Sequence, residues 1–521
     1  MGRSPGAKVP GSASAGPAPV SVLTCRLARG RSWRFWAALA VAVAASPLIY
    51  LGFSMARQAA YTARLPALPD LSRQPAAVRA HLTEADRTAR AHPTSAEAVG
   101  AAGLAYHADM FYEQAHRCYA IAEKLSGLAW RWTYYRALAQ GALGDADGLA
   151  VLLRRVVAAA PEFSPAWWQL GEAEFKAGRY DRAGEAWRRA STLQEPARPT
   201  AKGSPARVVS GPISAYAALG LARVAMVQGD AERAREVLER VTEKSPGFGP
   251  AFRLLGSAYA ALDRAKDAER AVRIADRLPA YDPYVDPMID ALARESRSST
   301  FLLQQASTAD LDTNAAWREY LVRRAVELDP ANTDALYDLA TMLRVLRRYD
   351  EALQVLERLR HLVPGDFQVL ADIGRCLSGL QRFAEAEAIV RRALEGLDDA
   401  NTHYTLGLVL DRLGRLPEAI VEFQRALERN PNHKDALNNL GVSFVRQGRL
   451  DQAAGQFERL VATDPDNADA HTNLGAVFLT QGSHDLADRE FRAALQLNPD
   501  HLLAREGLRK NAVSVGGQKQ R

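Results

Sequence analysis

The chain repeats itself every 34 residues. Gly407, Gly441 and Gly475 are spaced at this interval, and each follows a leucine and precedes a bulky apolar residue by three positions. An alanine, a phenylalanine and a proline then recur at fixed distances after each glycine: Ala419, Phe423 and Pro431; Ala453, Phe457 and Pro465; Ala487, Phe491 and Pro499. One unit of this length buries too little apolar surface to fold alone, so the period predicts a stacked array.

Each period holds two stretches with helical apolar spacing, separated by a turn such as QGR or LGR. The proline ends the second stretch, because proline cannot continue a helix. Small residues at the eighth and twentieth positions let the paired helices approach closely, and larger apolar residues fill the space between repeats. The pattern therefore predicts an all-α fold built from helix pairs.

These motifs resemble those of the tetratricopeptide repeat family, and the clearest single match is AWWQLGEAEFKAGRYDRAGEAWRRA at 166–190. The resemblance implies a right-handed α-α superhelical solenoid of about 10–11 repeats over most of 96–501. A repeat at 299–332 has a clear second helix and an unclear first one. The other repeats are expected to begin near residues 96, 130, 164, 215, 249, 333, 367, 400, 434 and 468.

Two breaks in the period divide the array. A Pro-, Gly- and Ser-rich stretch at about 194–213 predicts a loop insertion in an N-terminal array at 96–282. The second break, at 283–298, precedes a C-terminal array at 299–501. Its surroundings carry Tyr281, Tyr284 and several acids, so we consider both a partner contact and a capping or hinge role.

The segments outside the array complete the predicted organisation. We expect a basic disordered tail at 1–34, an uncharged helix at 35–56, a linker with a leading helix (about 76–91) at 57–95, and a capping helix and tail at 502–521. The net charge of +6 equals the number of basic residues in 1–56, which contains no acid. Residues 57–521 are formally neutral, so the charge does not indicate a nucleic-acid partner.

Residues 35–56 are uncharged, and as a helix they would be about 33 Å long, against a hydrocarbon core of about 30 Å. We therefore predict a transmembrane signal anchor. Arginines directly before it favour a cytoplasmic N-terminus, with the repeats extracytoplasmic or periplasmic on the inner (plasma) membrane. A cleaved signal peptide is the alternative, since Val43–Ala45 fits a cleavage site.

Motifs of common enzymes are missing from the sequence: it has no GxxxxGK[ST], HExxH or paired CxxC. We predict a protein that is not an enzyme and has no catalytic residue, cofactor, metal site or small-molecule substrate. His403 and His471 fall at the fourth position of their repeats, where a packing residue belongs.

The resemblance places binding on the first helix of each repeat, with the second, fifth, ninth, twelfth and thirteenth positions facing a concave groove. In the N-terminal array this gives Tyr134, Trp168, Phe175, Leu219 and Met226. In the C-terminal array the candidates are Asp338, Asp372, Tyr404, Asn438, Asn439 and Asn473.

The NNLG and TNLG segments around Asn439 and Asn473 resemble the asparagine-bearing repeats of the O-linked N-acetylglucosamine transferase superhelix. In that family the asparagines bond the backbone of an extended peptide, a task that suits amides because they donate and accept. The alternative is that Asn before Leu-Gly is simply common in this repeat.

The sequence thus predicts a membrane-anchored scaffold that binds other proteins or peptides in its groove to assemble an envelope complex. Two alternatives remain open. One is an assembly chaperone for secreted clients, similar to membrane-anchored repeat proteins of cytochrome c maturation. The other is an accessory or regulatory subunit of a separately encoded enzyme. The oligomeric state and the partner stay open.

Overall fold

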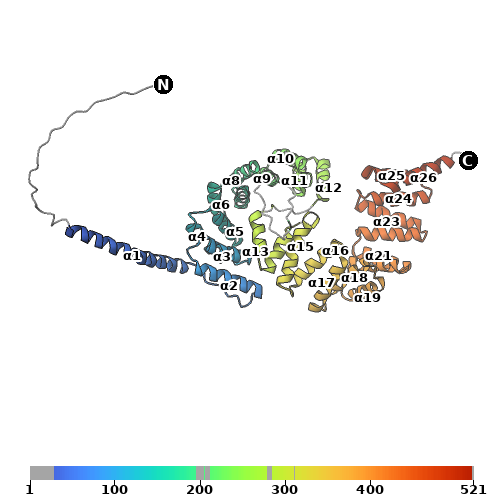
Figure 1. Ribbon diagram of the computed structural model, residues 1–521. Helices are drawn as coiled ribbons and strands as arrows, with labels where there is room; N and C mark the ends of the chain where they lie inside the picture. The colour runs from blue at the N-terminus through green and yellow to red at the C-terminus, as the bar shows by residue number, and fades with distance from the viewer. Residues whose placement is uncertain are drawn as a thin grey trace, which may run out of the picture.

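The computed structural model describes residues 29–194, 205, 212–278, 284, 286–309 and 311–518, and every regular element in them is an α-helix (Figure 1). Residues 1–28 of the predicted tail, most of the 194–213 insertion and Tyr281 lie outside the described residues. Residues 29–34, predicted to be part of the disordered tail, are helical instead. The predicted all-α solenoid of stacked helix pairs is confirmed for the described part of the chain.

The N-terminal array is a series of helix pairs whose odd-numbered members are the first helices. The predicted repeat starts at 96, 130, 164 and 249 coincide with the first residues of four of these helices. Its helices are α3 (Ala96–Ala108), α4 (Tyr112–Leu125), α5 (Trp130–Ala142), α6 (Ala146–Ala159), α7 (Ser164–Lys176), α8 (Tyr180–Thr192), α9 (Ile213–Val227), α10 (Ala231–Lys244), α11 (Gly249–Ala261) and α12 (Ala265–Ala275).

The C-terminal array continues the same alternation, with even-numbered first helices. The repeat whose first helix was unclear begins with a short helix, and its second helix has a non-helical backbone at Asn314 (φ −126°, ψ 23°). The helices are α14 (Ser299–Ser307), α15 (Leu311–Leu328), α16 (Thr333–Val345), α17 (Tyr349–Leu362), α18 (Phe367–Gly379), α19 (Phe383–Ala393), α20 (Ala400–Arg412), α21 (Leu416–Arg429), α22 (Lys434–Arg446), α23 (Leu450–Thr463), α24 (Ala468–Thr480) and α25 (His484–Leu497).

Close packing inside each pair explains the recurring glycine. A Cβ atom on Gly407 of α20 would lie 2.6 Å from the ring of Phe423 on α21, and one on Gly171 of α7 would lie 2.3 Å from the indole of Trp187 on α8. Both aromatic side chains are fully buried. A side chain at the glycine position would displace the ring, so the small residue and the aromatic one are a matched pair.

The expected packing role of two histidines is also seen. His403 and His471 are buried, and their Nδ1 atoms lie 2.6 Å from Glu422 Oε2 and 2.7 Å from Glu490 Oε2 on the second helix of the same pair. These polar pairs therefore join the two helices of a repeat from inside.

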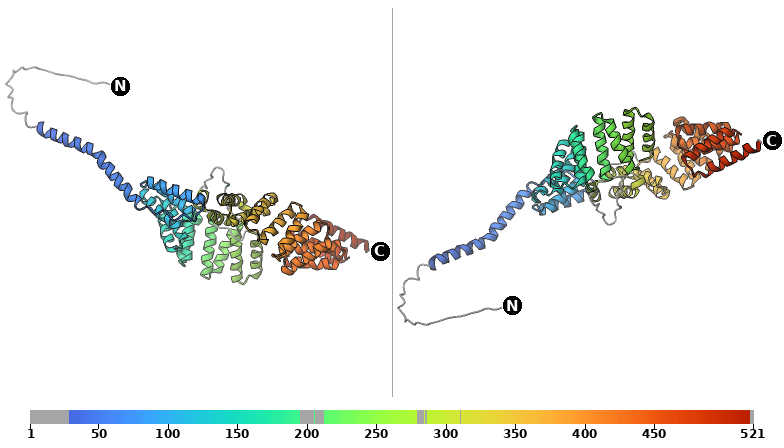
Figure 2. Two further views of the ribbon diagram at one scale, coloured as in Figure 1. Left: turned by 90° about the horizontal axis from the view of Figure 1, so that it is seen from below. Right: turned by 90° about the horizontal axis from the view of Figure 1, so that it is seen from above.

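The two arrays are connected by α13 (Pro287–Glu295), which lies against α3 of the N-terminal array (Figures 1 and 2). Arg324 of α15 donates hydrogen bonds to the carbonyl oxygens of Ala293, Arg294 and Ser296 at 2.8–3.1 Å. Leu292 belongs to one apolar cluster that contains side chains of both arrays. Residues 286–298 of the predicted insertion therefore link the two arrays.

The ends of the described chain differ. α26 (Leu502–Gln518) packs on α25 and α24 as a cap, with Asn511 Nδ2 donating to the carbonyl oxygen of His484 at 2.8 Å. At the other end α2 (Ala76–Ala91) covers α3, at the residues expected for the leading helix.

α1 (Arg29–Thr62) extends away from the arrays (Figure 2) and includes the stretch predicted to cross a membrane. Among the helices that the structure describes, none combines the length and the apolar character needed for a membrane crossing. The transmembrane part of the predicted fold is therefore not supported. Near the end of α1, Tyr61 packs on the apolar cluster shared by the two arrays, and the large exposed apolar side chains of this helix are Trp36, Leu39, Ile49, Tyr50, Leu51, Phe53 and Met55.

Candidate functional site

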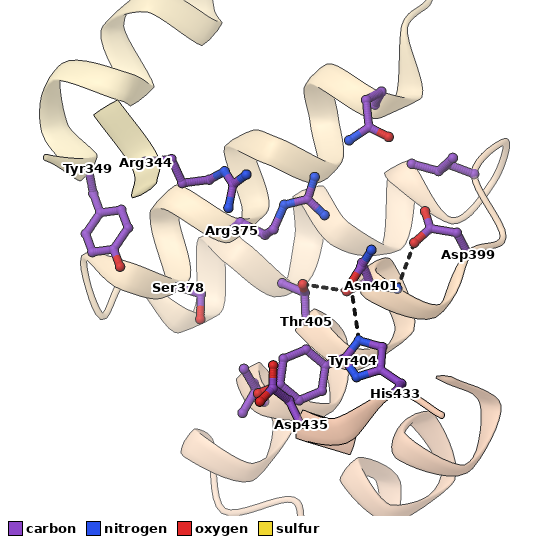
Figure 3. Close-up of a pocket in the computed structure, with 13 residues that line it drawn as sticks. Arg344, Tyr349, Arg375, Ser378, Asp399, Asn401, Tyr404, Thr405, His433 and Asp435 are labelled. Carbon is purple, nitrogen blue, oxygen red and sulfur yellow. Dashed lines mark hydrogen bonds between the residues drawn. The ribbon is translucent and has the colours of Figure 1, made fainter. Parts of the chain in front are cut away.

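A cleft of about 690 Å³ runs across the first helices of four consecutive C-terminal repeats, α16, α18, α20 and α22 (Figure 3). Because each helix is held by its own pair, the packed helices fix most of the lining side chains, while Leu397, Asp399 and His433 come from the segments just before α20 and α22. The cleft is lined by Arg344, Tyr349, Gln368, Arg375, Ser378, Leu397, Asp399, Asn401, Tyr404, Thr405, Leu408, His433 and Asp435.

The lining follows the repeat register. Counted from the repeat starts at 333, 367 and 400, Arg344 is a twelfth residue, Arg375 a ninth and Tyr404 a fifth. These are groove positions implied by the family resemblance. Of the predicted site residues only Tyr404 lines this cleft, and the two arginines were missed. The twelfth position, which gives Phe175 and Met226 in the N-terminal array, finds Arg344 in the C-terminal one, and the ninth position finds Arg375.

One end of the cleft is cationic. Arg375 donates to Asp372 Oδ1 from Nη2 at 2.7 Å and from Nε at 3.1 Å, and Arg344 Nε lies 3.4 Å from the same oxygen. Asp372 is buried, and Gln368 Nε2 donates to its other oxygen at 3.1 Å. Two guanidinium groups share one carboxylate, so this end has an excess of positive charge. Figure 3 shows the side chains of Arg344 and Arg375 next to each other. The sequence predicts Asp372 as a groove residue. In the structure its carboxylate instead holds the guanidinium groups of Arg344 and Arg375 in position.

The middle of the cleft is lined by aromatic and amide groups. The Tyr404 ring lies 4.9 Å from the His433 ring, and His433 Nε2 is 3.2 Å from Asn401 Oδ1. Asn439 Nδ2 donates to the Tyr404 hydroxyl at 3.0 Å. Burial raises the pKa of Tyr404 to about 12, so its hydroxyl stays protonated and can donate at neutral pH.

Two of the predicted asparagines, Asn439 and Asn473, donate hydrogen bonds to side chains of the preceding repeat. Asn473 Nδ2 donates to Asn438 Oδ1 at 3.1 Å, a bond between residues 35 apart, as is the bond from Asn439 to Tyr404. All three amides are half-buried. An amide offers two N–H donors and a carbonyl with two lone pairs, so one such bond leaves capacity for a ligand. Their binding of a peptide backbone stays a prediction.

The N-terminal candidates lie elsewhere. Tyr134 is fully buried and donates to Asp286 Oδ2, and the Trp168 ring packs on the Tyr284 ring at 4.8 Å. Both partners come from the segment between the arrays, which the sequence did not pair with these residues. The predicted groove on this array is therefore in contact with the chain itself.

The remaining predicted residues are in local packing. Phe175 lies 5.6 Å from the Trp187 ring, with the Arg223 guanidinium 4.3 Å from its centroid. Leu219 and Met226 are half-buried against the apolar cluster of α9–α11. Asp338 on α16 is half-buried, which raises its pKa, and it is not among the residues that line the cleft.

Comparison with known proteins agrees with this architecture. Two curated relatives align with this chain, and each alignment covers a quarter or less of the relative's own length. Tetratricopeptide repeat protein 8 of Caenorhabditis elegans is 26% identical over 125 residues, which is 23% of this chain and 25% of that protein. Anaphase-promoting complex subunit 3 of Schizosaccharomyces pombe is 27% identical over 124 residues, 24% of this chain and 19% of that protein.

Two solved structures are also similar. YrrB, described as a TPR protein with an unusual peptide-binding site, is 26% identical with a TM-score of 0.30, covering 36% of this chain and 96% of its own. The Cut9–Hcn1 hetero-tetramer of the APC/C is 13% identical with a TM-score of 0.38, covering 78% of this chain and 94% of its own.

Family models give the most extensive match. One model described as tetratricopeptide repeat matches residues 146–197, 214–283, 314–367, 404–457 and 438–501, and a second matches 346–406. Together they include more than half of the chain. The chain therefore belongs to the tetratricopeptide repeat family, whose members are protein-interaction scaffolds and generally not enzymes.

Proposed function

We propose that this protein is a non-enzymatic scaffold that binds extended segments of partner proteins across the first helices of its C-terminal array. The observation that supports this most is the cleft shared by α16, α18, α20 and α22. Its volume of about 690 Å³ is in the range of ligand sites. Packed helices present these side chains in fixed positions, which lowers the ordering cost of binding.

The chemistry of the cleft favours an acidic segment. Arg344 and Arg375 share Asp372 and retain charge for a second carboxylate, and guanidinium groups bind carboxylates through directed hydrogen bonds. Asn401 and Tyr404 farther along suit the polar backbone of an extended chain. A partner segment with Asp or Glu at one end is the ligand that matches this order.

A display library of random 12-residue peptides tests the proposal with full-length protein. Peptides selected by the wild type should be enriched in Asp and Glu, and their affinity should fall about 10-fold or more in an Arg344→Glu, Arg375→Glu variant, since losing a charged hydrogen-bonded pair costs about 1.5–3 kcal/mol. Arg392→Glu, on the exposed side of α19, is the matched control. Equal loss in the control would sink the proposal.

The proposal extends to location and process. We place the arrays outside the cytoplasm, attached through residues 35–56, where they assemble an envelope complex. Support for this part comes only from the uncharged stretch and the arginines before it. A periplasm-dependent reporter enzyme fused after residue 521 should be active, and membranes washed with alkaline carbonate should retain the protein. Activity of a cytoplasm-dependent reporter instead refutes the placement.

A further inference from the structure

The concave side of the N-terminal array is in contact with a segment of the same chain. Tyr284 packs on the Trp168 ring of α7 at 4.8 Å and on the Tyr216 ring of α9 at 5.7 Å. Two residues later, Asp286 accepts a hydrogen bond from the Tyr134 hydroxyl of α5. Tyr284 is 9% exposed and Asp286 3%.

The same segment continues along the array to α3. Ser296 Oγ donates to the carbonyl oxygen of Ala108 at 2.8 Å, and Arg297 N donates to Asp109 Oδ1 at 2.7 Å. The described residues 284 and 286–297 therefore contact α9, α7, α5 and α3 in turn, which are the first helices of four consecutive repeats. A bound ligand would follow the same path across such a groove, from one repeat to the next.

The anchoring contacts define what the groove recognises. An aromatic ring enters between Trp168 and Tyr216, and a carboxyl group two residues later meets the Tyr134 hydroxyl. Asp286 also accepts from Met288 N at 2.9 Å, so it caps the helix that begins with Pro287. The recognised pattern is an aromatic residue followed two positions later by an aspartate that starts a helix.

We propose that this groove is a second recognition site, specific for an aromatic–X–aspartate segment, and that residues 284–297 are its resident ligand. The site is separate from the C-terminal cleft and independent of the function proposed for it. A tethered segment has an effective concentration on the order of millimolar. An outside segment of the same pattern gains access only when the two internal anchors are weakened.

Substitution of the two anchor residues, Tyr284 and Asp286, tests this proposal in the full-length protein. The probe is a fluorescein-labelled peptide of residues 284–297, and its matched control replaces its Tyr284 and Asp286 with alanine. A Tyr284→Ala, Asp286→Ala protein should bind the probe at least about 10-fold more tightly than the wild type does, because the tethered competitor has lost its anchors. Adding Tyr134→Phe should weaken this binding about 5-fold.

Equal affinity of the wild type and the double variant for the probe, or equal binding of both peptides, would overturn the proposal. A milder variant covers the case in which the double variant does not fold. In Tyr134→Phe, amide exchange in 287–295 should be about 5-fold faster than in the wild type. Tyr404→Phe, in the other array, should leave it unchanged. Unaltered exchange in Tyr134→Phe also overturns the proposal.

Discussion

Gly441 on α22 lies directly against Phe457 on α23: a Cβ atom on Gly441 would stand 2.7 Å from the ring atoms Cε1 and Cζ. Phe457 is buried in the core of the C-terminal array and has no room to retreat. Gly441→Ala should therefore destabilise the array by about 1–3 kcal/mol, the usual cost of overpacking, as measured by urea denaturation.

Gly455 on α23 provides the matched control for that substitution. Nothing lies within 4 Å of a Cβ atom at this position, so Gly455→Ala adds helix propensity without a clash. It should stabilise the array by about 0.5–1 kcal/mol. Equal effects of the two alanines would show that the ring contact does not set the helix spacing.

Arg347 occupies a turn position that glycine holds in the repeats starting at 400 and 434. Its φ is +58°, in the left-handed region, and the equivalent Gly414 and Gly448 have φ of +78° and +72°. A residue with a Cβ atom is destabilised by about 1–2 kcal/mol in this region. Glycine avoids that cost, but its greater conformational entropy in the unfolded state offsets part of the gain. Arg347→Gly should thus stabilise the protein by about 0.5–1 kcal/mol in urea denaturation. A lower stability of the Arg347→Gly variant would show that the backbone at Arg347 is not strained.

Asp286 should make the packing of its segment depend on pH. Burial raises its pKa from 3.8 to about 6, while Tyr134 and Tyr135 of α5, Tyr284 and Asp290 are the titratable groups around it. A raised pKa stabilises the folded state fully below about pH 4, and the contribution is lost as pH rises through about 6. The difference is about 3 kcal/mol.

Hydrogen exchange in 287–295, corrected for intrinsic rates, should therefore show less protection at pH 8 than at pH 5. Asp286→Asn keeps the side chain neutral at both values and should remove most of this difference. The same pH dependence in the asparagine variant would assign it to another group.

The helix pairs were predictable because Gly, Ala and Pro recur in one phase, and each has a steric reason to be where it is. The starts of α5 at Trp130 and α22 at Lys434 coincide with the predicted ones. The groove positions of Arg344 and Arg375 also follow from the register.

The contact of Tyr134 with Asp286 could not be predicted. It joins residues 152 apart in sequence, and the segment that carries Asp286 falls in a break of the period. Repeat phase places residues relative to their neighbours along the solenoid, and it contains no information on a segment that crosses back over earlier repeats. For this reason the repeat phase predicts Tyr134 and Trp168 as contacts of an outside ligand, whereas the structure pairs them with Asp286 and Tyr284.

Site-specific photo-crosslinking tests the central claim of a peptide-binding cleft in the C-terminal array. A photoreactive amino acid at Ser378, inside the cleft, should crosslink in cells to a discrete segment of a partner protein, and Arg344→Glu with Arg375→Glu should abolish that product. The same amino acid at Gln424, exposed on α21, should not give it. Identical products from both positions, or a product that survives the two charge reversals, would contradict the account.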